Sequence, residues 1–436
     1  MVRSPSLVSV VAAFLMLGVM AGDSPATQGG PFPEWENGLP ADPAHFPIGV
    51  WLQNERFLHD YRDMGINLYI GLGGWRSQQE QLTYLRQHNM PVIAHQNSTM
   101  RSLLAQNSSL LDPVVAWMQQ DEPDNAQSDG QGGWGPPVTP EEIQSRYETF
   151  QSHDPTRPVY MNLGQGVAWD GWVGRGVRTN RPEDYPEYQK GADILSFDIY
   201  PAASTRPQTQ GQLWRVGYGV KRLREWTDDD KPVWNIIEAS RISGAGMVSP
   251  HEIRALAWMS IVHGSTGIGY FVHEWDSDGS LVSTHSLRGN DVLRPAVTAV
   301  NHQIHELAPV INSPTLHDRV NVISGNTADS IATNYGVDGI ATMLKSDGED
   351  GYYLFTVRMR ETSAMGTFQI LDLVGRGGEA YVLGEDRMIP IDADGMFSET
   401  YDGWDTKLYH IVPEPTSAAL LAAGAGLLLM RRRGRA

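Results

Sequence analysis

Residues 114–124 read VVAWMQQDEPD, a continuous apolar run that ends in a cluster of acidic residues. A short apolar run of this kind is typical of a strand that is buried on both faces, as in a parallel sheet. A helix start follows at Thr139, which precedes a proline and two glutamates. This stretch therefore predicts a strand, a polar loop and a helix in that order.

The same unit recurs between residues 46 and 312. Helix starts of the capping-box type stand at Ser77 and Ser249. Eight strand–helix units over this length predict an α/β fold of the (β/α)₈ TIM-barrel type. A doubly wound open sheet is the alternative, but the sequence has no complete Gly-x-Gly-x-x-Gly. The expected strands are 48–52, 67–71, 92–95, 114–119, 158–162, 194–199, 233–237 and 268–272.

After residue 312 the pattern changes to short apolar runs without helices between them. Turn-forming clusters such as Glu349-Asp350-Gly351 separate several of these runs. Residues 313–412 are therefore expected to form a small all-β, sandwich-like domain.

The composition restricts the class of protein. The chain has 436 residues, 41% of them apolar, which is enough for a full core. It has no cysteine, so disulfide scaffolds and thiol nucleophiles are excluded. Its net charge of −18 disfavours nucleic acid and anionic membranes as partners, because both attract basic surfaces. Neutral ligands such as sugars remain compatible with this charge.

Residues 1–22 have one arginine, a short apolar stretch and a small-residue end, which together predict a secretory signal peptide. A buried N-terminal helix is the alternative. The stretch 22–33 is rich in glycine, proline and serine and gives such a helix nothing to continue into. Residues 23–45 are therefore expected to be a linker.

The C-terminal residues 413–436 combine Pro413-Glu414-Pro415, a short apolar run and a cluster of arginines. This tail closely resembles the PEP-CTERM sorting signal of bacterial exported proteins. The resemblance implies export in a Gram-negative-type bacterium, processing by exosortase-type machinery, and a place at the cell surface or in the extracellular matrix. Membrane contact would then be made only through the tail before processing. An ordinary single-span anchor is the alternative.

Barrel enzymes of this type have their active sites at the C-terminal ends of the strands. Glu122 follows the fourth expected strand and Glu238 follows the seventh, so the two can face each other across the mouth of a closed barrel. Hydrolysis of a glycosidic bond needs such a pair, one carboxylic acid and one carboxylate.

Other side chains at the strand ends suit a sugar ligand. Indole rings stack on the apolar faces of sugars, while amides and carboxylates bind hydroxyls. The expected substrate-binding residues are Asp121, Tyr200, Asp198, Trp275, Gln96, Asn162, Trp75 and Trp169, and Trp134 and Trp172 are expected on the same face.

This arrangement resembles clan A of the glycoside hydrolases, which includes β-galactosidases, β-mannanases and cellulases. The resemblance implies that Glu122 is the acid/base, that Glu238 is the nucleophile and that the anomeric configuration is retained. Tyr200 and Trp275 match positions that the clan often uses after strands six and eight. The chain departs from the clan at Asp121, where an asparagine that binds the sugar 2-hydroxyl is usual.

The sequence thus predicts an exported retaining glycoside hydrolase without cofactor or metal. His302 and His305 lie three residues apart, but no further ligand set accompanies them. Two alternatives remain open. One is a non-catalytic carbohydrate-binding or matrix protein on a barrel scaffold, and the other is an inverting hydrolase.

Overall fold

The structure is a computed structural model that describes residues 32–73, 76–242, 246–324 and 330–415. Eight parallel strands pair in sequence order, and the last pairs with the first to close a barrel. The predicted barrel is confirmed, and each strand lies within two residues of its expected bounds. The strands are β1 (Ile48–Trp51), β2 (Leu68–Ile70), β3 (Val92–His95), β4 (Val114–Met118), β5 (Val159–Leu163), β6 (Ile194–Asp198), β7 (Val233–Glu238) and β8 (Gly267–Phe271).

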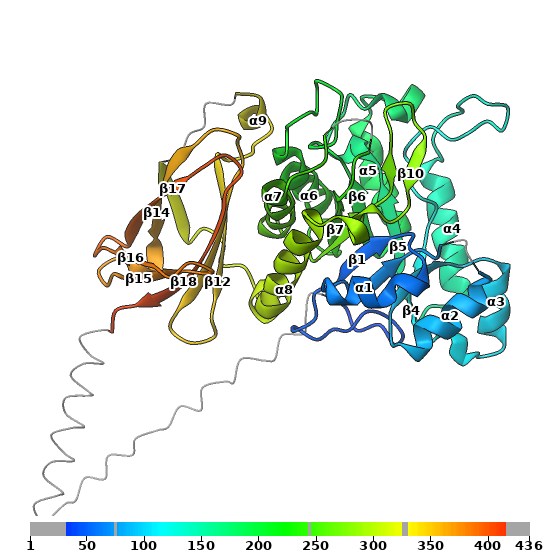
Figure 1. Cartoon of the computed structure of the whole chain (residues 1–436), viewed down its shortest axis with the longest axis horizontal. Helices are drawn as coiled ribbons and strands as arrows, with labels where there is room; N and C mark the ends of the chain where they lie inside the picture. Colours follow the sequence, from blue (N-terminus) through cyan, green and yellow to red (C-terminus); the bar gives the residue numbers. More distant parts are fainter. Residues whose placement is uncertain (1–31, 74–75, 243–245, 325–329, 416–436) are drawn as a thin grey trace, which may run out of the picture.

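Helices surround this barrel (Figure 1). The predicted starts are confirmed, because Ser77 and Ser249 form capping boxes and the Thr139 side chain accepts a hydrogen bond from the Glu142 amide. The helices are α1 (Leu58–Asp63), α2 (Gln78–Gln87), α3 (Ser98–Ala105), α4 (Pro140–His153), α5 (Tyr185–Tyr188), α6 (Trp214–Trp226), α7 (Pro250–Val262) and α8 (Leu293–Ile311).

Alternate residues of the strands fill the inside of the barrel. Ile93, Met118 and Trp234 belong to one buried cluster there. Phe32 and Leu39 join the same cluster, and the Phe32 ring meets Trp234 edge-on at 6.4 Å. The described part of the expected linker 23–45 therefore packs into the barrel core, because its apolar side chains find buried partners there despite its glycine- and proline-rich composition.

The C-terminal domain consists of two antiparallel sheets that enclose a second core. The sandwich-like domain predicted from sequence is confirmed. The apolar runs 340–344, 352–357, 367–373, 380–383, 388–391 and 408–412, which the sequence predicts as strands, each overlap a strand, whereas β11 and β17 were not expected. One sheet contains β11 (Val320–Ser324), β14 (Ala364–Ile370) and β17 (Met396–Tyr401). The other contains β12 (Ile340–Ser346), β13 (Tyr352–Arg358), β18 (Thr406–Pro413), β15 (Gly378–Val382) and β16 (Met388–Ile391), and a short helix α9 spans Ser330–Asn334.

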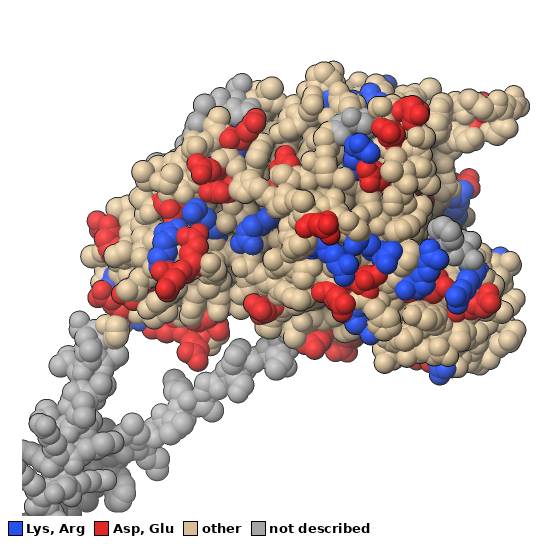
Figure 2. Space-filling view, viewed as in Figure 1, with Lys and Arg blue, Asp and Glu red and all other residues tan. Residues whose placement is uncertain are grey.

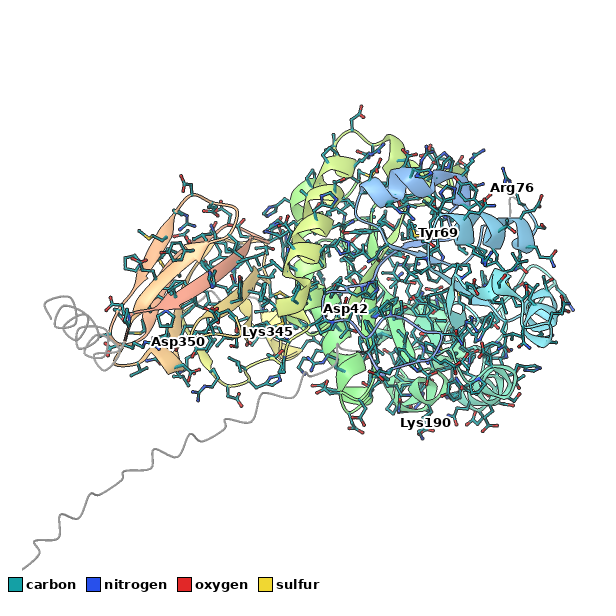
Figure 3. All side chains as sticks on the ribbon, turned by 90° about the horizontal axis from the view of Figure 1, so that it is seen from below. Asp42, Tyr69, Arg76, Lys190, Lys345 and Asp350 are labelled. Atoms are coloured by element: carbon teal, nitrogen blue, oxygen red, sulfur yellow. The ribbon has the colours of Figure 1, made fainter. Side chains whose placement is uncertain are left out.

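The two domains share a continuous apolar interface along α7 and α8 (Figure 1). The rings of Trp258 from α7 and Phe355 from β13 stack at 5.5 Å. Lys345 lies where the domains meet, and its ammonium donates a hydrogen bond to the Ser313 carbonyl, whereas Asp350, between β12 and β13, lies farther from the barrel (Figure 3). The β domain is thus fixed against the side of the barrel.

Acidic and basic side chains alternate over both domains on the face in view (Figure 2). Within the described ranges, none of the helices has the length and apolar character that a membrane span requires. The expected signal peptide 1–22 and, from residue 416, the expected sorting tail lie outside the described residues.

Candidate active site

Glu122 lies in the loop that follows β4, at the C-terminal mouth of the barrel. Its φ is 41°, a left-handed conformation that costs free energy in a residue other than glycine. Its amide donates to the Asn162 carbonyl at 3.0 Å, and its own carbonyl accepts from the Asn125 amide at 3.0 Å. These two bonds hold the strained backbone and fix the direction of the Glu122 side chain.

The Glu122 carboxyl is closely packed against neighbouring residues. Asn125 donates a side-chain hydrogen bond to it and accepts one from the Trp172 indole at 2.9 Å. A Cβ atom at Gly164 would lie 2.7 Å from the Asn125 amide nitrogen and 3.0 Å from Glu122 Oε1. Glycine at position 164 therefore makes room for the carboxyl and its partner.

A chain of buried hydrogen bonds runs from the barrel interior to the mouth. The Tyr160 hydroxyl is 2.5 Å from Ser196 Oγ, which donates to Asn162 Oδ1 at 2.7 Å. The Asn162 amide nitrogen then donates to Asp198 Oδ2 at 2.9 Å and to Asp121 Oδ1 at 3.1 Å. This series of hydrogen bonds orients the Asn162 side-chain amide so that both of its N–H groups face carboxylates.

The Glu122 and Asp198 carboxyls are hydrogen-bonded to one another. Burial, and then the negative charge of neighbouring carboxyls, raises the pKa of both groups above its ordinary value. Two carboxyls in contact share one proton, so the pair holds an acid and a carboxylate side by side. Asp121 is exposed as a residue, yet its carboxyl lies against Asn162, and burial there raises the pKa of Asp121 to about 6.

Glu238 ends β7 as expected, but it is 0% exposed. Its two carboxylate oxygens accept hydrogen bonds from the Ala202 and Ala203 amides, at 2.8 and 2.6 Å. Burial raises the pKa of Glu238 to about 8, although these two amides act in the opposite direction. The carboxyl contact that the structure gives Glu122 is with Asp198, and Glu238 instead holds the loop after β6.

Aromatic side chains flank the acidic group. The Phe271 ring lies 5.3 Å from Tyr200 and stacks on Trp275 at 5.5 Å, so these three residues form one aromatic row. The rings of Trp169 and Trp172 lie 5.8 Å apart. The Trp172 indole donates a hydrogen bond to Asn125, which in turn donates to the Glu122 carboxyl.

Two other expected residues, Gln96 and Trp134, are not brought to this group. Gln96 is buried and donates to the Phe150 carbonyl of α4 at 3.1 Å, so it faces the surrounding helices rather than the mouth. Trp134 is 78% exposed in the loop between β4 and α4. Trp75 lies outside the described residues.

Sequence reasoning did not single out Ser196, Asn125 or Phe271. Ser196 precedes Asp198 by two residues on the same strand face, and Phe271 is the last residue of β8, so the alternation of strands could have indicated both. Asn125 directly follows the acidic cluster, but its contact with Glu122 depends on the turn between them.

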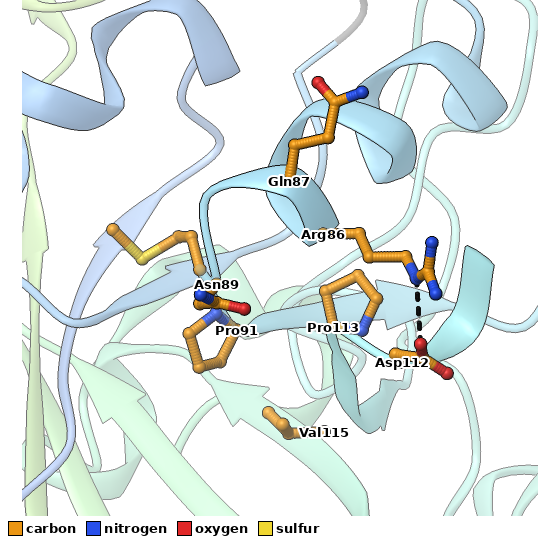
Figure 4. Close-up of a pocket in the computed structure, with 8 residues that line it drawn as sticks. Arg86, Gln87, Asn89, Pro91, Asp112, Pro113 and Val115 are labelled. Carbon is orange, nitrogen blue, oxygen red and sulfur yellow. Dashed lines mark hydrogen bonds and ion pairs between the residues drawn. The ribbon is translucent and has the colours of Figure 1, made fainter. Parts of the chain in front are cut away.

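A pocket at the opposite, N-terminal end of the barrel precedes β3 and β4 (Figure 4). Its charged side chains, Arg86 and Asp112, pair with each other at 2.8 Å. Conserved chemistry in barrels of this type lies at the other end of the strands. In the part of the chain that the structure describes, no group of three or more histidine, cysteine or acidic side chains is arranged to hold a metal ion.

Several solved glycoside hydrolases are similar in structure. A catalytic mutant of the GH42 β-galactosidase Gan42B from G. stearothermophilus has a TM-score of 0.52 at 9% identity, over 84% of this chain and 98% of that one. A family 5 glycoside hydrolase from Bacteroides vulgatus has a TM-score of 0.51 at 13% identity, over 86% and 90%. A third structure, described as a glycoside hydrolase, has a TM-score of 0.50 at 11% identity, over 84% and 92%.

At these identities the similarity establishes the fold. No protein-family model matches the sequence, and the comparison with curated proteins finds no match.

Proposed function

We propose that this chain is a glycoside hydrolase that cleaves O-glycosidic bonds in an oligo- or polysaccharide, with Glu122 as the general acid/base. The observation that carries the proposal is the contact between the Glu122 and Asp198 carboxyls at the mouth of the barrel. Glycoside hydrolysis requires one protonated and one ionised carboxyl near the bond that breaks, and the mouth of this barrel offers both kinds of group. The fold shared with glycoside hydrolases agrees with this reading.

We propose a retaining mechanism on the resemblance to clan A of the glycoside hydrolases, in which the anomeric configuration is retained. Inverting enzymes separate their two carboxyls by about 6.5–9.5 Å to admit a water molecule, whereas retaining enzymes hold them about 5–5.5 Å apart. The anomeric configuration of the first product distinguishes the two mechanisms. The proposed reaction is a double displacement through a covalent glycosyl-enzyme.

The surroundings of the pair suit a sugar. Tyr200, Phe271 and Trp275 offer aromatic faces, and Asp121, an exposed residue, offers a carboxyl for hydroxyls, whereas the polar atoms of the buried Asn162 are already paired. The bound ligand would thus combine stacking with hydrogen bonds. These features favour a neutral carbohydrate.

We further propose that the protein is exported and reaches the cell surface or the extracellular matrix. The support is the pattern of residues 1–22 and the PEP-CTERM-like tail from residue 413. Exosortase-type machinery would process this tail. Expression of the full chain in a Gram-negative host that has an exosortase, followed by fractionation, tests the location.

The first test is turnover by the purified protein. Nitrophenyl β-galactoside, β-mannoside and β-cellobioside serve as probes, and NMR of the first product formed reports its anomeric configuration. We expect nitrophenol release with retention. Oligosaccharide binding without turnover of any probe would contradict hydrolysis and identify a binding protein. An inverted product would exclude the double displacement.

A second test concerns pH. Replacing Asp121 with Asn removes a negative charge beside Glu122 and so lowers the pKa of the Glu122 carboxyl. The basic limb of the kcat/KM profile reports deprotonation of the catalytic acid. We therefore expect this limb to move to lower pH, by about one unit. A limb that stays in place in the variant would show that Asp121 does not tune Glu122.

A further inference from the structure

Lys345 is a buried cation at the junction of the two domains (Figure 3). It lies on β12, is 4% exposed, and its ammonium donates a hydrogen bond to the Ser313 carbonyl. Within the described residues, no carboxylate forms an ion pair with it. Lysine is almost never fully buried unless it is paired, because a buried charge loses its hydration. The fold therefore buries the Lys345 charge without a counter-ion from the protein.

The charged group that acts on Lys345 is a second cation. Burial, and then the guanidinium of Arg224, lowers the pKa of Lys345 to about 8, so the ammonium keeps its proton at neutral pH. Arg224 pairs with Asp229 at 2.8 Å, and Asp230 is exposed to solvent. The two acidic residues nearby are thus engaged elsewhere or hydrated, and Lys345 stays uncompensated.

Lys345 and Arg224 line a pocket of about 270 Å³ between the start of β8, the end of α8 and β12. One water needs only about 10–15 Å³, so the pocket has room for a small polyatomic ion. Thr266, which precedes β8, lines it too, and its hydroxyl is buried without a hydrogen-bond partner in the part of the chain that the structure describes. An ammonium has three N–H donors, of which Ser313 takes one. The pocket therefore brings together unused donors from both domains.

We propose that this pocket binds a small oxyanion of the phosphate and sulfate class, held by the Lys345 ammonium and the Thr266 hydroxyl. Such an anion supplies the charge that Lys345 lacks and accepts both hydrogen bonds. Because Lys345 belongs to the β domain and Thr266 to the barrel, the bound anion stabilises the contact between the domains. The pocket lies at the N-terminal end of β8, away from the mouth of the barrel, and the proposal does not depend on glycoside hydrolysis.

Thermal unfolding in increasing phosphate, sulfate or acetate tests the site, with ionic strength held constant by chloride. A ligand that binds only the folded state stabilises it. We expect phosphate and sulfate to raise the Tm of the wild-type protein by about 2 °C or more and to saturate in the millimolar range. Acetate, a carboxylate with the same acceptor chemistry, should have a smaller effect.

Three variants make this test specific. Lys345→Met keeps the length of the side chain and removes the charge, so the saturable rise should disappear. Its Tm without added oxyanion should equal or exceed that of wild type, because an unpaired buried charge is lost. Thr266→Val keeps the shape and should weaken phosphate binding by about three- to tenfold. Lys190→Gln, which changes an exposed lysine, is the matched control and should respond as wild type does.

Two results would overturn the site. An equal rise in wild type and Lys345→Met, or a rise that grows with concentration and does not saturate, would show only the general stabilisation that these salts give folded proteins. Saturation by acetate alone would overturn the phosphate and sulfate class. If circular dichroism shows that Lys345→Met does not fold, Thr266→Val decides, and unchanged phosphate affinity in that variant would contradict the proposal.

Discussion

Replacing Glu122 with Gln should lower kcat on nitrophenyl glycosides by about 10²–10⁴-fold, the range that a positioned general acid contributes. Glutamine keeps the size of the side chain but has no proton to give to the leaving oxygen. The loss should be smaller on dinitrophenyl glycosides, because that leaving group departs without protonation. Steady-state kinetics on both probes measures the difference. Binding of the unlabelled sugar should persist.

The control for this prediction is Glu148→Gln, which changes an exposed glutamate on α4 and should keep wild-type kinetics. Equal losses on the two probes would contradict proton donation by Glu122. Full activity of Glu122→Gln would remove the residue from the mechanism altogether.

Replacing Glu238 with Ala should lower the free energy of unfolding by about 2–5 kcal/mol. Two backbone amides, of Ala202 and Ala203, lose their acceptor, and each unsatisfied buried group costs about 1–3 kcal/mol. Glu238→Gln keeps one acceptor oxygen and should fall between wild type and Glu238→Ala. Urea unfolding followed by tryptophan fluorescence measures the series.

Glu148→Gln again provides a matched comparison, with an expected change within about 0.5 kcal/mol. If Glu238→Ala is as stable as wild type, the loop after β6 does not depend on Glu238. The interpretation that Glu238 holds this loop in place would then be wrong.

The sequence predicts the barrel well because its strands are continuous apolar runs and its helices begin with side-chain caps. Both signals are local. β17 was missed because its exposed face is polar, which breaks the apolar run Met396–Tyr401. The barrel-core role of Phe32 and Leu39 was missed because it depends on partners far along the chain, such as Trp234.

The candidate site was predictable in part. Strand ends identify Glu122, Asp198 and Glu238 as residues of one barrel face, but not which carboxyls touch. These contacts depend on the backbone, because Glu238 accepts hydrogen bonds from the Ala202 and Ala203 amides. Backbone amides are present in every residue except proline, so the sequence does not indicate which of them will bind a carboxylate. Gln96 also follows a strand, yet its side chain turns to α4.

The most direct test of the account is a crystal structure of Glu122→Gln with an intact oligosaccharide bound. We expect the glycosidic oxygen within about 2.6–3.2 Å of the side chain at position 122. A sugar bound away from the mouth of the barrel, or with its glycosidic oxygen out of reach of position 122, would contradict it.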